Sequence, residues 1–596
     1  TSTPDNSAVH VSVSPNPANK FATVTIDASA SVGSYNWFEF DFGDGTAHVQ
    51  QAGASTTHQY DVVNFQDTTY TVKVTGQRAS GNPVVGTANL LVKDLPPQVT
   101  AIDPGSDKKG VIGEWIKVAG ANFYSTPTIT VDGQTAAHVE VIDTANLRFR
   151  VPPASRAGTR DVFFTFTGYA PQKMTLDVKR YAVATSARYG NVYLMDVDQN
   201  EAVTDTTLRL PVTNASTVKI SPDGSTAYVT DGRFNFLSTG TITILDLTSN
   251  SGPAVVGSIQ AGNGPLFDIE PAANAPLLVA GDAFGIYLFD VSDPLHPVQK
   301  EYDSILFAGD PVNDVGAADI AVTPDGSKIA VLNALDSEAR LFTQTNFHVT
   351  NANTPKRVSV GPKTQKAAIS DDGNTLYVLG GGGEGAVPMD LSDPRAANIT
   401  AIDIHDGTLA SAPVMAGPYL LSDMNATNVI APVPFDLAIS RSNAHNVYVT
   451  TLDQGFTTLF NDLSNLVNNP SIANLITLVN FLATGGLNFG DTISVLNADG
   501  AGRSLGTPYQ STLTAPTAAD LLFNDHVMLQ SSFRIWYDSS ADNGNGSLVF
   551  QTGATAVNSF NHTSTYMPFE TEDLSFGAVL GLFAPPFSFG DCAFQP

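Results

Sequence analysis

The sequence predicts an all-β protein, built from two Ig-like β-sandwiches followed by a seven-bladed β-propeller with a helical insertion. Two observations predict this fold class. Residues 1–179 contain short runs of alternating apolar and polar residues between turn residues, the pattern of half-buried strands in small sandwiches. Residues 180–577 repeat one motif at intervals of about 50 residues, as the blades of a propeller do.

Composition sets the general class of the protein. Its 596 residues correspond to roughly four domains of about 150 residues each. Only 14% of residues are charged, against about 25% in an average domain. Acidic residues number 57 and basic residues 29, so the net charge is 29 − 57 = −28. Nucleic acid is excluded as a partner, because phosphate binding requires a basic surface.

Cysteine content and the chain start indicate the compartment. The single cysteine, Cys592, excludes an intrachain disulfide and a Cys-based metal or haem site. The chain starts at Thr1 without methionine and is rich in Ser, Thr and Asn, which favours a processed, secreted protein, extracellular or at the cell surface. The longest apolar segment, 475–483, is too short for a transmembrane segment. Candidate glycosylation sites are five Asn-x-Ser/Thr sequons, at Asn214, Asn398, Asn425, Asn545 and Asn561.

The first predicted domain, residues 1–94, contains the sequence Tyr35-Asn-Trp-Phe-Glu-Phe-Asp-Phe-Gly-Asp-Gly-Thr46, followed by His58-Gln-Tyr60. It resembles the PKD (polycystic kidney disease) domain family, apart from an inserted Phe38-Glu39-Phe40. The resemblance implies an Ig-like sandwich with Trp37 in its core. We also expect a tight turn with positive φ at residues 43–45.

Two carboxylates at this turn have alternative roles. Asp41 and Asp44 either contact a calcium ion or accept hydrogen bonds from their own turn. Because Asp side chains commonly cap turns, we favour the second interpretation.

The second predicted domain, residues 95–179, begins with the stiff Leu95-Pro96-Pro97 segment. Strand and turn signals then alternate, and Gly120-Ala-Asn-Phe123 stands where the IPT/TIG family has Gly-x-Asn-Phe. The order of these pieces resembles that family, an Ig-like spacer and interaction module. The resemblance brings no catalytic residue to this chain.

The third predicted domain, residues 180–577, carries the repeats. Ile220-Ser-Pro-Asp-Gly-Ser-Thr-Ala-Tyr-Val-Thr-Asp231 returns in related form, with the aligned apolar residue at positions 220, 269, 322, 369, 439, 523 and 576. Four-strand units of this length build a β-propeller. The units resemble the YVTN-type repeat of seven-bladed propellers. We expect Pro-Asp-Gly to form the turn between the innermost and second strands of a blade.

We expect the ring to close through its last strand. Residues 181–212 contain three strand runs but no innermost strand, and residues 573–577 have no outer strands after them. Placing 573–577 in the first blade completes both units and removes two exposed edges.

Two units are longer than the others, at residues 411–433 and 456–484. The second reads as two helices, with Asn469 as cap, Pro470 in the first turn, and an apolar stripe that includes Ile472, Leu475 and Ile476. This insertion is either a lid packed on the propeller or a docking element. We favour the lid, since apolar helix faces usually find their own core.

No catalytic or cofactor-binding residue can be assigned. The ten histidines show no metal-ligand spacing, and Gly380-Gly-Gly-Gly-Glu-Gly385 leads to no helix that would bind a nucleotide. No cofactor is expected, with calcium the one candidate ion. Two partial calcium loops supply the candidate ligands, which are Asp196, Asp198, Asn200, Asp538 and Asp542. Solvated turns explain the same residues.

The predicted tail, residues 578–596, is strongly apolar. Its candidate contact residues are Phe583, Phe587, Phe589 and Phe594. Because exposing such side chains is costly, the segment packs on its own propeller or enters a groove on a neighbour. Cys592 lies within this segment, and burial is favoured over a link to another chain.

These features lead to three functional hypotheses. The leading one is a non-enzymatic structural or adhesion protein outside the cell, which partners with itself in a layer or filament, or with another surface protein or glycan. The alternative is a propeller enzyme or ligand-binding protein, because YVTN-like propellers are similar to lactonases and quinoprotein dehydrogenases. The third is a carbohydrate- or matrix-binding adhesin. Convergent charged side chains at the channel mouth would favour an enzyme.

Overall fold

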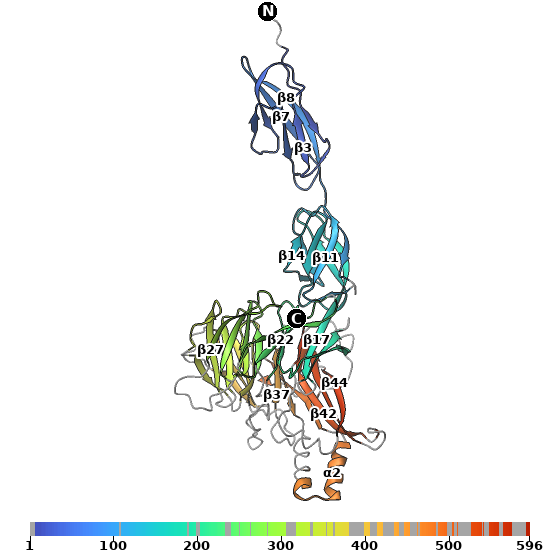
Figure 1. Cartoon of the computed structure of the whole chain (residues 1–596), viewed down its shortest axis with the longest axis vertical. Coiled ribbons are helices and arrows are strands. Elements are labelled where there is room, and N and C mark those ends of the chain that lie inside the picture. The colour runs from blue at the N-terminus through green and yellow to red at the C-terminus, as the bar shows by residue number, and fades with distance from the viewer. Residues whose placement is uncertain are drawn as a thin grey trace, which may run out of the picture.

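The computed structural model places the two sandwiches in line on one side of a propeller, with the helix α2 (Ile472–Ala483) on the opposite side (Figure 1). In some strands only the backbone is described. The structure describes residues 6–595 apart from 106–108, 187–189, 198–202, 233–239, 250, 263, 283, 305–316, 334–337, 353–354, 361–363, 381–397, 406–413, 421–433, 440–445, 453–461, 463–464, 484–486, 498–503, 506–508, 511–525, 539, 541–546, 559–563 and 575–591.

The first sandwich packs a three-stranded sheet against a five-stranded sheet. The smaller sheet has the order β1 (Ser12–Ser14), β3 (Thr23–Asp27), β6 (Ser55–Gln59). The larger sheet has the order β2 (Ala18–Asn19), β8 (Val84–Lys93), β7 (Thr68–Arg78), β4 (Tyr35–Asp41), β5 (Val49–Gln51). Alternate residues of both sheets face one shared core, as in other sandwiches.

The core of this sandwich differs from the expectation at Trp37. Phe38, Phe40 and Phe42 are buried, whereas Trp37 is only half-buried. The register between β4 and β7 shifts between Tyr35 and Trp37, so the residues after this bulge alternate with the phenylalanines inward. The inserted phenylalanines therefore take the core position expected for Trp37. The turn that follows has positive φ at Gly43 and Gly45, as predicted.

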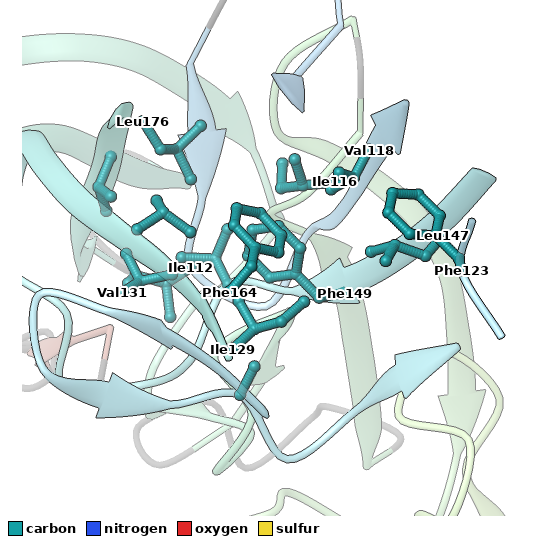
Figure 2. Packing of buried hydrophobic residues seen from close by; sticks show 14 of the residues in the cluster. Ile112, Ile116, Val118, Phe123, Ile129, Val131, Leu147, Phe149, Phe164 and Leu176 are labelled. Carbon is teal, nitrogen blue, oxygen red and sulfur yellow. The ribbon is translucent and has the colours of Figure 1, made fainter. Parts of the chain in front are cut away.

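The second sandwich also consists of two sheets around one core (Figure 2). One sheet has the order β14 (Val139–Val141), β15 (Asn146–Arg150), β11 (Trp115–Ala121), β9 (Gln98–Asp103). The other contains β13 (Gln134–Thr135), β12 (Thr128–Val131), β16 (Gly158–Thr165), β17 (Gln172–Ser186) and β10 (Gly110–Val111). Phe149 and Phe164 meet edge to face at the centre, where Ile129 from the second sheet joins them.

Strand β17 belongs to both the second sandwich and the propeller. Its first half pairs with β16, and its second half pairs with β18 (Asn191–Val197). The expected division after residue 179 therefore falls inside a continuous strand, with no flexible linker at that point. This continuity restrains the arm relative to the propeller.

The described strands of the propeller form seven blades, whose strands run in the following order from the axis outward. Blade 1 contains β45 (Cys592–Phe594), β17, β18 and β19 (Val203–Pro211). Blade 2 contains β20 (Val218–Ile220), β21 (Thr226–Thr230), β22 (Thr241–Asp246) and β23 (Ala254–Gln260). Blade 3 contains β24 (Asp268–Pro271), β25 (Leu277–Gly281), β26 (Gly285–Asp290) and β27 (Val298–Ser304). Blade 4 contains β28 (Ala317–Val322), β29 (Lys328–Asn333), β30 (Glu338–Thr345) and β32 (Lys356–Ser359), and β31 (His348–Val349) pairs with β30.

Among the described residues, the remaining three blades depart from this plan in two respects. Blade 7 has three strands, and Leu487 and Asn488 of blade 6 pair with Ile535 and Arg534 of blade 7. Blade 5 contains β33 (Thr364–Ile369), β34 (Thr375–Gly380), β35 (Asn398–Asp403) and β36 (Val414–Leu420). Blade 6 contains β37 (Pro434–Ile439), β38 (Asn446–Leu452) and β39 (Leu487–Asn497), with the short strands β40 (Ser504–Leu505) and β41 (Tyr509–Gln510) outside β39. Blade 7 contains β42 (His526–Asp538), β43 (Ser547–Asn558) and β44 (Ser564–Leu574).

Contacts between innermost strands close the ring. They run in the order β20, β24, β28, β33, β37, β42, β45 and back to β20. The expected closure through the first blade is therefore present, but with a different strand: 592–594 pairs with β17. The segment expected to close the ring, 573–577, was assigned wrongly, because Asp573 and Leu574 end the outer strand β44. The strand β45 escaped prediction because it is three residues long and no turn motif follows it.

The repeated turn has the same geometry in three blades. Asp223, Asp325 and Asp372 each accept hydrogen bonds from a hydroxyl two residues before and a backbone N–H two residues after. The glycine that follows each aspartate has positive φ. The prediction that Pro-Asp-Gly joins the innermost and second strands is confirmed at 222–224 and 324–326.

The two long units have different origins. Within residues 411–433, Val414–Leu420 forms β36, the outer strand of blade 5, so this unit holds less insertion than expected. The unit at 456–484 is helical at 465–468 and in α2. The cap differs from the prediction: Ser471 Oγ accepts the N–H of Asn474 at 3.1 Å, because α2 begins at Ile472 and not beside Asn469.

Candidate functional site at one pole of the propeller

The strand order defines two poles of the propeller. The turns between innermost and second strands lie at the pole that contacts the second sandwich, where Arg150 forms an ion pair with Asp223. Because neighbouring strands are antiparallel, the innermost strands begin at the other pole, where the second strands end. The sequence that contains α2 connects β38 to β39 at that same pole, opposite the arm (Figure 1).

Four charged side chains are buried near the beginnings of four innermost strands. They belong to consecutive blades, and their exposed fractions are 1%, 3%, 5% and 6% for Asp268, Asp319, Lys366 and Asp436. Each directly precedes an apolar residue of its strand. Buried charges require partners, so their contacts indicate what this pole can bind.

Two of the carboxylates link neighbouring blades. The N–H of Ile320 donates to Asp268 Oδ2, with 2.8 Å between N and O, and the N–H of Ala367 donates to Asp319 Oδ2 at 2.7 Å. Each bond joins one innermost strand to the next. These bonds are charge-assisted, and they hold adjacent blades in register at the axis.

Lys366 interrupts this series. Its Nζ lies 3.6 Å from Asp319 Oδ1 and 3.8 Å from Asp436 Oδ1, so the ammonium group stands between two carboxylates. A lysine cannot accept the next N–H, and the N–H of Leu437 instead donates to Asp436 at 2.9 Å. This site therefore contains three carboxylates and one ammonium group among the described residues.

The second oxygen of Asp268 has no partner. Oδ1 is buried and no described group donates to it, while Oδ2 is held by Ile320. An unpaired buried carboxylate oxygen is costly, and a hydroxyl, an ammonium group or a water molecule would satisfy it. Asp268 therefore has unused capacity to bind, and among the described residues Asp462 Oδ2, in the connection from β38 to β39, is likewise buried without a partner.

None of these four residues was predicted as a site residue. Asp319 and Asp436 each begin an Asp-apolar-small sequence, Asp319-Ile-Ala and Asp436-Leu-Ala, that recurs in several repeats, whereas Asp268 and Lys366 do not. The available signal was a charged residue inside an otherwise apolar innermost strand. Of the two other residues with this pattern, Asp520 lies outside the described residues and Asp573 lies in the outer strand β44.

The predicted calcium ligands do not come together within the described part of the chain. Asp196 lies 3.4 Å from Lys179 Nζ, and Asp538 accepts the N–H of its neighbour Ser540 at 2.8 Å. Asp198, Asn200 and Asp542 lie outside the described residues. No group of three or more His, Cys, Asp or Glu side chains that could hold a metal occurs among the residues described.

At the first sandwich, Asp41 and Asp44 accept hydrogen bonds from their own turn, at Gly43 N and Thr46 N. Asp44 also lies 2.6 Å from His58 Nε2. Both carboxylates thus have the capping role favoured from the sequence.

The other predicted positions fall in several places. Asn214 lies in a turn with positive φ before β20, and Asn398 begins β35. The backbones of Cys592 and Phe594 pair with Ala184 and Ala182 in blade 1. Six positions lie outside the described residues, namely Asn425, Asn545, Asn561, Phe583, Phe587 and Phe589.

A separate ionisable cluster lies at the outer rim between blades 3 and 4. Glu301 Oε2 is 2.8 Å from His348 Nδ1, and Glu301 Oε1 accepts the N–H of Val349 at 3.2 Å. Burial, reinforced by the hydrogen bond and charge of Glu301, raises the pKa of Asp303 to about 6. Burial also opposes ionisation of Glu301, but hydrogen bonds from Asp303 and His348 outweigh it and lower its pKa.

Comparison with known proteins gives similarity of fold only. The chain matches no protein-family model, and no curated protein matches it. Among solved structures, a Bacteroides fragilis protein named for 6-phosphogluconolactonase is 11% identical with a TM-score of 0.41, over 70% of this chain and 98% of that one. A periplasmic gluconolactonase of Pseudomonas aeruginosa is 10% identical with a TM-score of 0.41, over 70% and 98%. Hydrazine synthase of Kuenenia stuttgartiensis is 14% identical with a TM-score of 0.32, over 58% and 92%.

These neighbours correct the leading functional hypothesis. A non-enzymatic structural or adhesion protein was expected, whereas the neighbours named above carry the names of enzymes, as in the alternative hypothesis of a propeller enzyme. At such identities the similarity concerns the propeller fold, and no residue role is taken from it. In the described part of the chain, no helix is long and apolar enough to cross a membrane.

Proposed function

We propose that the propeller binds a small, uncharged, polyhydroxylated molecule at the pole opposite the arm and hydrolyses a lactone or similar ester there. The observation that carries this proposal is the buried Asp268 Oδ1, which has no hydrogen-bond donor among the described residues. A hydroxyl group of a ligand would supply that donor. Lactone hydrolysis agrees with the alternative expected from the sequence, and the chemistry of this pole supports it.

The charge of the site indicates the class of ligand. Three carboxylates and one ammonium group give a net charge of 1 − 3 = −2 among the four residues. Such a site favours neutral polyols and disfavours anions such as phosphorylated sugars. A neutral sugar lactone, which carries several hydroxyls and one polarised carbonyl, satisfies both requirements.

The same groups provide the chemistry of ester hydrolysis. A carboxylate can take a proton from the attacking water, and Asp268 is the candidate for this role because Oδ1 is unoccupied. An ammonium group stabilises the oxyanion that develops on the carbonyl oxygen, and Lys366, which contacts Asp319 of the blade between it and Asp268, is the candidate for this role. Asp319 and Asp436 would hold Lys366 charged and in place.

We also propose a secreted location and an arm role for the first two domains. The single cysteine, the sequons and the residue composition support export. The resemblance of residues 1–94 to PKD domains and of 95–179 to IPT/TIG domains supports spacer modules. The arm would then hold the propeller away from an attachment point while leaving the proposed site free.

Hydrolysis of neutral and phosphorylated lactones by the full chain tests the proposal. Acid release is followed by pH indicator, with the spontaneous rate subtracted, for the wild type, Asp268→Asn and the control Asp293→Asn, an exposed aspartate of blade 3. We expect catalysis of a neutral aldonolactone, a loss of about 100-fold or more in Asp268→Asn, and an unchanged control. Absence of catalysis with every lactone, or full activity of Asp268→Asn, would refute the proposed function.

A further inference from the structure

The helix α2 exposes an apolar face at the pole opposite the arm. Ile472 is 78% exposed, Ile476 53% and Leu475 38%, and Val467 just before the helix is 62% exposed. Ile472, Leu475 and Ile476 are spaced as neighbours along one side of a helix. We call these four residues the α2 face. Exposed apolar side chains gathered in this way are typical of interaction surfaces.

The α2 face is not the side that packs on the propeller. Leu478 is buried, and α2 contacts strand β42 of blade 7. By the rotation of about 100° per residue, Leu478 lies well around the helix from Ile472 and Ile476. Leu475, the least exposed of the four residues, is the i−3 neighbour of Leu478 and marks the edge between the α2 face and the packed side. The expectation of a fully packed lid is therefore wrong for the described residues of this stripe, because the helix projects from the body of the propeller (Figure 1).

The absence of charged residues around α2 limits which partners can bind the α2 face. The chain carries a net charge of −28, yet residues 463–490 contain no Asp, Glu, Lys or Arg. A partner recognised by charge would find nothing to pair with here. Two copies of the chain repel each other elsewhere, but they can approach through this uncharged segment, which keeps their acidic bodies apart.

A lipid surface fits this helix poorly. Helices that lie on membranes usually carry Lys or Arg on their polar face, and α2 has none. The turn before α2 contains Asn468, Asn469 and Ser471, whose polar groups would have to leave water if the tip entered a bilayer. The acidic chain would also be repelled by anionic lipids.

We propose that the α2 face is the contact surface for a second copy of this chain, forming a two-fold symmetric dimer. Two helices with the same i, i+3, i+4 stripe are self-complementary, because the ridge of one fits the groove of the other in an isologous contact. The arms would then point away from each other at the two ends of the dimer. This inference is independent of the proposed enzymatic function.

The oligomeric state of the full chain tests this inference by sedimentation equilibrium. The variant Ile472→Asn/Ile476→Asn is compared with the control Val255→Asn/Val256→Asn, which changes two exposed residues of β23. We expect a wild-type dimer that strengthens with added salt, because salt screens the repulsion between the acidic bodies. The dissociation constant should rise at least ~10-fold in the α2 variant and stay unchanged in the control.

Three results would overturn the inference. They are a wild type that is monomeric at all concentrations, a dimer that survives the α2 substitutions, and co-sedimentation with neutral lipid vesicles that those substitutions abolish. Circular dichroism and the unfolding temperature confirm that each variant is folded. The inference is supported if the α2 variant is folded and monomeric while the β23 control variant still forms the dimer.

Discussion

The side chain of Gln595 donates from Nε2 to the backbone oxygen of Gly224, with 2.7 Å between the two atoms. Gln595 follows the ring-closing strand β45, and Gly224 lies in the turn between the first two strands of blade 2. Oε1 of the same side chain accepts the N–H of Tyr181 at 2.8 Å, and Arg180 Nε donates to the Gln595 backbone oxygen at 2.7 Å. One buried residue near the end of the chain thus joins blades 1 and 2.

Gln595→Ala should destabilise the propeller by about 2 kcal/mol, because it leaves buried groups of Tyr181 and Gly224 without partners. The free energy of unfolding in urea measures this effect. Gln299→Ala, at an exposed position in β27, is the control and should stay within about 0.5 kcal/mol of the wild type. Equal stability of the two variants would show that Gln595 does not secure the closure.

Gly113→Ala should loosen the arm from the propeller. Gly113 has φ of 81°, and an added Cβ would lie 2.5 Å from Asp223 O and 2.8 Å from Ser225 N, both backbone atoms of blade 2. Gly133 has φ of 82° with no atom within 4 Å of an added Cβ, so Gly133→Ala carries the same backbone strain without the clash. Small-angle scattering should show a wider range of arm orientations only for Gly113→Ala. A similar change in both variants would contradict the docking described above.

The free energy of unfolding should fall as the pH rises, because Asp303 in the cluster at the outer rim ionises. The pKa of Asp303 is about 6 in the folded chain, above the value of about 3.9 for an unfolded aspartate. Its stabilising contribution is therefore complete below about pH 4 and lost as the pH rises through 6. Discounted for solvent screening, the loss amounts to roughly 1 kcal/mol.

Unfolding free energies at pH 5 and 7.5 test this dependence. Between pH 5 and 7.5, Asp303→Asn should lose less unfolding free energy than the wild type, since the uncharged amide cannot ionise beside Glu301. Asp293→Asn should retain the wild-type dependence. If Asp303→Asn loses as much unfolding free energy as the wild type over this range, Asp303 is not the group that causes the pH dependence.

Phe40→Ala should lower the free energy of unfolding of the first sandwich by about 3–5 kcal/mol, because Phe40 is fully buried in the core. Trp37→Ala should cost about 1 kcal/mol, since the indole is half-buried on the other side of β4. Thermal unfolding of residues 1–94 within the full chain compares the two. If Trp37→Ala destabilised the sandwich more than Phe40→Ala, Trp37 would be the core residue, as expected from the sequence.

Local sequence determines much of this fold. The repeated apolar pattern places five innermost strands, β20, β24, β28, β33 and β37, because it lies within a dozen residues. A Pro-Asp-Gly turn marks the end of two of them, β20 and β28. The position of Trp37 was not predictable in this way, since a single bulge after Tyr35 reverses which side chains face inward.

Long-range contacts explain most of what sequence reasoning missed. The role of Asp268 depends on Ile320 in the next blade, and that of Lys366 on Asp319 and Asp436 on either side of it. Gln595 similarly acts through Gly224, far away in the chain. Such partners become neighbours only when the ring closes, so no local pattern identifies them.

The proposed function requires Asp268 to be a binding residue and not only a structural link between blades 3 and 4. The most direct test measures, for Asp268→Asn, both the free energy of unfolding and the affinity for a neutral aldonolactone or its hydroxy acid. The amide can still accept from Ile320 while removing an unpaired buried charge, so we predict a gain of about 1–3 kcal/mol in stability together with loss of binding. A less stable variant that binds as tightly as the wild type would contradict the account.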